Sequence, residues 1–235
     1  MSIKGWSPKN KFGSDIMHLY NGHGDNSGIF FDMIFFKEYL EEFDKYINDL
    51  KNKIKQSDFY KEIGYLNPSE ENIIYNFKPL MLNSLFVSCF SYFESKLYEI
   101  SSICSHHLSL ERLSKFKDSE RKNRITPALI YIKFLRNKVG LSLNDIDEKL
   151  NFYKDVRNYI MHQDLDSKQK NISLEKLKTD KDLSIISFTL DDESVLIVQG
   201  TFVQRFIELI SEKLKDIMDQ IKIKYDLMEY VDTSK

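Results

Sequence analysis

Glycine, proline and cysteine are all scarce in this 235-residue sequence, which holds 8, 4 and 2 of them respectively. The low glycine and proline content excludes collagen-like and low-complexity chains, and a hydrophobic share of 42% can supply a buried core. Acidic and basic residues nearly balance, 36 against 34, so the chain is no polycation that holds nucleic acid by bulk charge. Any contact with phosphate must therefore come from a local group of residues.

Long hydrophobic runs are also missing. The longest charge-free run, residues 79–93, is 15 residues long and falls short of the ~20 apolar residues that a bilayer helix needs. The N-terminus has no apolar segment of the kind found in signal peptides. We therefore expect a cytoplasmic protein without a membrane span, in which the two cysteines, Cys89 and Cys104, are reduced core residues.

Several sequence signatures are absent as well. The sequence has no P-loop, no Rossmann glycine pattern and no serine-hydrolase elbow, which argues against NTPases, oxidoreductases and serine hydrolases. Two histidine pairs, His18 with His23 and His106 with His107, lack the spacing of zinc ligands. We expect neither a metal nor another cofactor.

Hydrophobic periodicity predicts an all-α protein, a bundle of about five helices with a small β-hairpin. The expected elements are an irregular, glycine-rich arm over residues 1–28, followed by a single helical domain over 29–235 with the hairpin at 183–198 between the last two helices. The expected helices cover 29–57, a stretch from Pro79 that stops before His106, Thr126 to Gly140, Ser142 to about His162, and a stretch that opens at Thr201. Thr126 is the expected N-cap of its helix, and Thr201 is expected to form a capping box with Gln204. The helix from Pro79 carries an apolar row on one side: Leu82, Phe86, Cys89, Phe90, Phe93, Leu97 and Ile100.

The first of these helices has an apolar seam whose residues are spaced three and four apart: Met33, Phe36, Leu40, Phe43, Ile47, Leu50 and Ile54. The seam is typical of a helix that packs within its own bundle. A coiled-coil contact with another chain is the alternative, and packing within the bundle is favoured over it because the repeat does not continue past about four heptads.

The helix expected from Ser142 carries an unusual arginine. On a helical wheel with Leu150 at zero, Met161 falls at about 20° and Arg157 at about −20°, inside the predicted buried stripe. A buried guanidinium cannot lose its charge, so it needs an acidic partner or must line a site. Glu94 is a candidate partner if Arg157 is only structural. Asn158 and His162 flank the same stripe.

The segment from Arg157 to His162 reads Arg-Asn-x-x-x-His, which resembles the signature of the HEPN family. Members of that family are helical bundles, and an earlier core helix often carries an aromatic-acid pair like Phe93-Glu94; a hairpin after the motif also fits. The resemblance covers residues 75–225 loosely and 156–162 closely.

The resemblance implies a metal-independent endoribonuclease that works as a homodimer, with Arg157 and His162 catalytic and Asn158 supporting. His162 would take the proton of a ribose 2′-hydroxyl as that oxygen attacks the phosphate. Arg157 would stabilise the charge on phosphorus, and Glu94 would support the site from behind. The family also suggests a toxin or anti-phage defence effector under the control of an antitoxin or a sensor protein.

The sequence departs from the family in one respect. Some toxin members carry a tyrosine two residues after the histidine, where a partner enzyme can modify it, whereas this chain has Asp164. Silencing by that route is therefore not expected.

A basic segment precedes the motif. Between Arg112 and Lys138 lie nine basic and two acidic residues, and those expected to contact RNA are Lys115, Lys117, Arg121, Lys122 and Arg124. The same segment also fits a solvated basic surface. The second candidate function for the whole chain is a non-catalytic HEPN-like bundle that binds a partner protein or a nucleotide.

Overall fold

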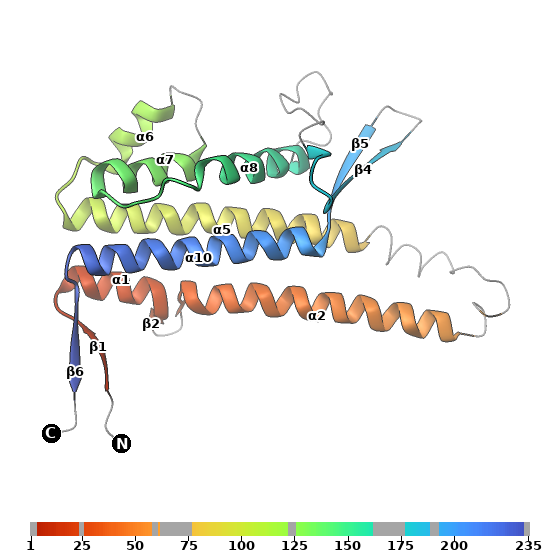
Figure 1. Cartoon of the computed structure of the whole chain (residues 1–235), viewed down its shortest axis with the longest axis horizontal. Coiled ribbons are helices and arrows are strands. Elements are labelled where there is room, and N and C mark those ends of the chain that lie inside the picture. Colours follow the sequence, from red (N-terminus) through yellow and green to blue (C-terminus); the bar gives the residue numbers. More distant parts are fainter. Residues whose placement is uncertain are drawn as a thin grey trace. The chain divides into compact units, whose positions relative to one another are not determined.

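The structure of the chain, a computed structural model, describes residues 4–23, 26–57, 61, 77–121, 126–161, 177–188 and 193–232. It is mainly α-helical, which confirms the predicted fold class (Figure 1). The described residues form seven α-helices: α1 (Lys11–Asn21), α2 (Ile29–Gln56), α5 (Lys78–His107), α6 (Leu113–Arg121), α7 (Pro127–Phe134), α8 (Asp147–Met161) and α10 (Gly200–Lys224). A short π-helix, η2 (Leu135–Val139), continues α7.

The strands form three antiparallel pairs. They are β1 (Lys4–Pro8) with β6 (Met228–Asp232), β2 (Gly22–His23) with β3 (Asn26–Ser27), and β4 (Leu183–Phe188) with β5 (Glu193–Val198). The last pair confirms the predicted hairpin, with Leu183 opposite Val198 and Phe188 opposite Glu193. Most of the buried residues lie on helix faces, and the hairpin adds Leu183, Leu196 and Val198.

The chain divides into two compact units. The first unit comprises Met1–Ile34, Ser91–Asn151 and Leu209–Lys235, and the second comprises Phe35–Phe90 and Phe152–Glu208. Helices α2, α5, α8 and α10 each contribute residues to both units.

In the first unit, α1 is fixed against the end of α5. The ring of Phe12 stacks on the ring of His107 at a centroid distance of 5.0 Å. Asp15 lies 2.8 Å from Nε2 of the same histidine. These contacts, together with the β1–β6 pair, tie the start of the chain to its end.

Residues 1–28 were predicted to have no regular structure, and that prediction is wrong. Asn10 caps α1 by accepting a hydrogen bond from the Gly13 N–H at 2.9 Å, and Phe12 and Ile16 are buried. Strand β1 pairs with β6, more than 200 residues away. Its pairing partner is remote in sequence, so no local pattern announces the strand.

Helix α2 confirms the predicted amphipathic helix. Met33, Leu40, Ile47 and Ile54, spaced seven apart, are each 5% exposed or less. This burial occurs within a single chain, which favours the packing interpretation of the seam over a coiled coil between chains.

Three helix ends differ from the predictions. Helix α5 runs to His107 and does not stop before His106. Helix α8 begins at Asp147, because the segment from Ser142 packs as a loop that buries Leu143 and Ile146. Helix α10 begins at Gly200, so Thr201 lies inside the helix and forms no capping box with Gln204, whose side chain bonds to Glu208.

Other predicted features are confirmed. Helix α5 buries the expected row Leu82, Phe86, Cys89, Phe90, Phe93, Leu97 and Ile100. Gly140 follows η2 with a φ of 74°, a left-handed conformation that suits glycine.

The second unit contains a buried bridge between a helix and the hairpin. The side-chain amide of Asn83 on α5 donates to the Leu196 carbonyl at 2.8 Å and accepts from the Val198 N–H at 3.1 Å. Asn83 is only 6% exposed. One side chain thereby satisfies two backbone groups of β5 and fixes the hairpin to α5.

We predict that Asn83→Ala lowers the free energy of unfolding by about 2–3 kcal/mol, because two buried backbone groups lose their partner. Chemical denaturation of the variant and the parent measures the difference. Ser84→Ala, at an exposed neighbouring position on α5, is the control. A loss for Asn83→Ala no larger than that of the control would contradict this role.

The burial of the two cysteines predicts that their thiols react slowly in the folded protein. Burial raises the pKa of Cys89 and of Cys104 to about 12, and both thiols are free. Because the thiolate is the reactive form, neither should react with iodoacetamide at pH 8 in the folded protein. Both should react in denaturant. Mass spectrometry of the alkylated chains checks this, and rapid native labelling of either cysteine would show that its burial is wrong.

Candidate active site on helix α8

The second half of α8 is anchored by three buried residues at a spacing of three. Tyr153, Val156 and Tyr159 are 8%, 0% and 1% exposed. Steps of three residues do not close a full turn, so the buried face winds by about 60° at each step. The side of the helix that is buried at Leu150 is therefore no longer the buried side at Tyr159.

This winding corrects the predicted place of Arg157. Met161, expected in the buried stripe, is 52% exposed. Arg157 and Asn158 are half-buried and lie at the margin of the buried face of α8. The wheel assumed one fixed face along the whole helix. Arg157 therefore lies beside the core and not in its centre. At that position its polar atoms can contact a ligand.

The guanidinium of Arg157 is sparsely bonded. Its Nη1 donates to Oδ1 of Asn158 at 3.0 Å. Its Nε is buried and finds no acceptor among the described residues. Within the described part of the second unit, no carboxylate forms an ion pair with Arg157.

Two other arginines of the chain show what a structural pairing looks like. Arg136 donates from both terminal nitrogens to the Asp147 carboxylate, at 3.1 and 2.8 Å, and also to the Leu143 carbonyl. Arg205 bonds Asp180 at 2.8 and 2.9 Å and lies 2.9 Å from Asp182. Among the described residues of its unit, Arg157 has no such pair of acidic partners.

His162, the predicted general base, follows Met161 directly but lies outside the described residues. The geometry between Arg157 and His162 therefore stays a prediction of the Arg-Asn-x-x-x-His spacing.

Glu94 belongs to the first unit and has a defined contact there. Its Oε1 accepts a hydrogen bond from the Ala128 N–H at 3.3 Å, at the N-terminus of α7. Thr126 occupies the predicted N-cap position, but its side chain makes no capping bond. Glu94 thus performs the capping predicted for Thr126, and a carboxylate suits the positive end of a helix. Its predicted role beside Arg157 stays a prediction.

The basic segment is less basic in the structure than its composition indicates. Lys133 pairs with Glu120 at 3.0 Å, and Arg136 pairs with Asp147. Lys138 pairs with Glu111 at 3.1 Å. Two of these acids, Asp147 and Glu111, lie outside the counted window, which is why the count overstated the local charge.

Of the five residues predicted to contact RNA, two can be placed in full. Lys115 is exposed on α6, and Lys117 is half-buried. Arg121 ends α6, but its side chain, Lys122 and Arg124 lie outside the described part of the chain. The described cations of the segment that lack an acidic partner are Arg112, Lys115 and Lys117.

The described residues contain no group of three or more His, Cys, Asp or Glu side chains that could hold a metal ion, and the side chain of His23 lies outside them. The ring of His107 stacks on Phe12, and its Nε2 lies within hydrogen-bond distance of Asp15. His106 is exposed next to it, with the two rings 5.0 Å apart.

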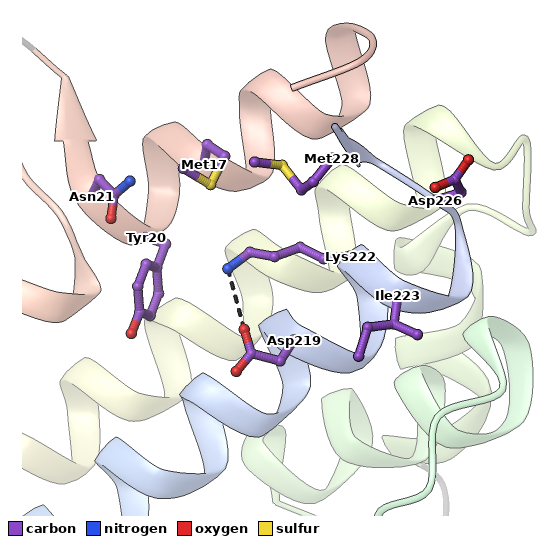
Figure 2. A pocket seen from close by; sticks show the side chains of 8 residues that line it. All are labelled: Met17, Tyr20, Asn21, Asp219, Lys222, Ile223, Asp226 and Met228. Carbon is purple, nitrogen blue, oxygen red and sulfur yellow. Dashed lines mark hydrogen bonds and ion pairs between the residues drawn. The ribbon is translucent and has the colours of Figure 1, made fainter. Parts of the chain in front are cut away.

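Figure 2 shows a cavity of about 620 Å³ in the first unit, lined by residues of α1, α10 and the start of β6. Its charged groups are already engaged. Lys222 bonds Asp219 at 3.3 Å and lies 4.7 Å above the Tyr20 ring, and Asp226 pairs with Lys9 at 2.6 Å. Met17, Met228 and Ile223 make the rest of the wall largely apolar. The cavity offers space but no free reactive group.

Comparison of the chain with models of known protein families, with curated proteins and with solved structures finds no match. Across the described ranges, none of the helices combines the length and the apolar character needed to cross a bilayer.

We predict that Arg157→Ala leaves the melting temperature nearly unchanged, since no carboxylate among the described residues of the second unit pairs with Arg157. Arg136→Ala is the matched comparison. It removes two charged hydrogen bonds from Asp147, so it should cost about 1–3 kcal/mol. Thermal denaturation measures both. A loss for Arg157→Ala as large as that for Arg136→Ala would show that Arg157 is a structural strut.

Proposed function

We propose that the chain is a HEPN-like, metal-independent endoribonuclease that cleaves RNA through attack of the 2′-hydroxyl. The observation that carries the proposal is the half-buried Arg157, five positions before His162, whose Nη1 donates to Asn158 and whose buried Nε has no acceptor among the described residues. Burial of a guanidinium N–H without an acceptor costs desolvation free energy, and a hydrogen bond to an anionic ligand would offset that cost.

Arg157 can perform the electrostatic part of the reaction. Its planar fork can bond two oxygens of one phosphate at once, which favours the charge that develops on phosphorus during attack. The bond to Asn158 restricts the rotation of the guanidinium, so the fork is oriented before the substrate arrives.

His162 supplies the proton transfers. A neutral imidazole accepts the proton of the 2′-hydroxyl, and an imidazolium donates a proton to the leaving 5′-oxygen. The product is a 2′,3′-cyclic phosphate. One histidine cannot be base and acid at the same moment, so we propose that two copies of the chain face each other and that each contributes its Arg157 and His162.

The proposed setting follows from the same family resemblance. A ribonuclease of broad activity harms the cell that makes it, so such a protein acts as a toxin or an anti-phage effector held in check by an antitoxin or a sensor protein. Action on cellular RNA would place it in the cytoplasm.

Growth of the expressing host tests the proposal. Induction of the parent chain should arrest growth, and His162→Ala should relieve the arrest. Arg157→Lys keeps the charge but loses the bidentate fork, and should relieve it largely. Lys149→Ala, at an exposed site on α8, is the control and should arrest growth like the parent.

Equal amounts of each variant, measured by immunoblot, are required for the comparison. Arrest by His162→Ala as strong as that by the parent would contradict the ribonuclease proposal. Normal growth with every variant would favour the non-catalytic bundle that binds a partner protein or a nucleotide.

A further inference from the structure

A second cavity of the first unit lies in the region where the sequence is basic. It measures about 570 Å³, a volume in the usual range for small-molecule sites, and is lined by residues of α5, the following loop and α6. Its polar lining includes Tyr98, Ser102, Ser105, His106, Arg112 and Lys117. Among the described residues, two permanent cations and several hydroxyls line it, and no carboxylate does. The site is therefore suited to an anion.

Lys117 is held in place at this cavity. Its Nζ donates to the Tyr131 hydroxyl at 3.1 Å and lies 5.6 Å from the centre of the same ring. Tyr131 is only 4% exposed, so this support is rigid. An ammonium has three N–H donors, and the bond to Tyr131 uses one. The remaining two can bind the oxygens of a phosphate.

Tyr98 provides an aromatic surface next to the cations. Its ring packs against the ring of Tyr131 at 5.7 Å, yet 48% of the residue is exposed. One buried tyrosine thus positions both Tyr98 and Lys117. An exposed, fixed aromatic ring beside a cationic centre is the combination on which nucleic-acid bases stack while their phosphates are bound.

Arg112 completes the cationic side. It directly precedes α6, its side chain is exposed, and it has no acidic partner in the described part of the chain. Its neighbour Glu111 is engaged by Lys138. A tight turn sets this position, because Ser109 adopts a φ of 49° and the Leu110 N–H bonds the Ser105 carbonyl.

We propose that this cavity binds a nucleotide, with the phosphate on Arg112 and Lys117 and the base on Tyr98. The ligand is either a free mononucleotide or one unpaired residue of an RNA strand, since both present the same phosphate and base. The proposal does not rest on cleavage at Arg157 and His162. It adds a binding site in the other compact unit.

Binding to full-length His162→Ala protein tests the proposal, because that background prevents cleavage of the probe. One arm titrates AMP by calorimetry, and the other titrates a fluorescein-labelled 12-nucleotide single-stranded RNA by anisotropy, both in EDTA. Arg112→Ala and Tyr98→Ala should each weaken binding about tenfold. The matched controls are Lys37→Ala and Tyr46→Ala, exposed positions on α2, which should stay within about twofold of the parent.

Tight binding of AMP identifies a free nucleotide as the ligand, and binding of RNA alone identifies a strand. Either supports the site if Arg112→Ala weakens it. Absence of binding in both arms overturns the proposal, and so does equal weakening by Arg112→Ala and Lys37→Ala, which would show only bulk charge. Circular dichroism confirms that Tyr98→Ala is folded; Arg112 makes no described side-chain contact, so its variant tests the site even if Tyr98→Ala unfolds.

Discussion

The packing of Tyr153 is the constraint on which the candidate active site depends. Its ring lies 4.7 Å from Phe206, 5.2 Å from Phe202 and 6.2 Å from Phe86, so it joins α8 to α10 and to α5. Arg157 follows Tyr153 by one helical turn, and residues four apart lie on nearly the same side of a helix. The aromatic cluster thereby fixes where the guanidinium can go. Burial raises the pKa of Tyr153, which keeps this anchor uncharged.

The elements with a strong local signal were predictable from the sequence. The seven-residue spacing in α2, the apolar row of α5 and the glycine after η2 each follow from side-chain periodicity or backbone geometry at one place. The hairpin β4–β5 was also found, because β-branched runs flank a polar turn. Elements that depend on remote partners were not predictable. Strand β1 needs β6, and α1 needs His107, so neither is visible in its own segment.

The candidate site shows the same division. The order Arg157, Asn158, His162 is a local feature of the sequence, and the structure adds that Arg157 is bonded to Asn158 and has no acidic partner among the described residues of its unit. Its depth was misjudged because the buried face of α8 winds, a property that appears only when neighbouring helices are present. The basic segment was overrated for a related reason. Glu111 and Asp147 lie just beyond its ends and neutralise Lys138 and Arg136 in space. Tyr98 and Arg112, which do meet at one cavity, were not linked by any spacing rule.

The most direct test of the ribonuclease proposal is incubation of purified chain with total RNA and with tRNA in EDTA, with His162→Ala in parallel and the product ends mapped. We predict that only the parent chain cleaves, without a divalent metal, and that its products end in 2′,3′-cyclic phosphates. Equal cleavage by His162→Ala, or a requirement for Mg²⁺, would contradict the assignment of Arg157 and His162 as the catalytic pair.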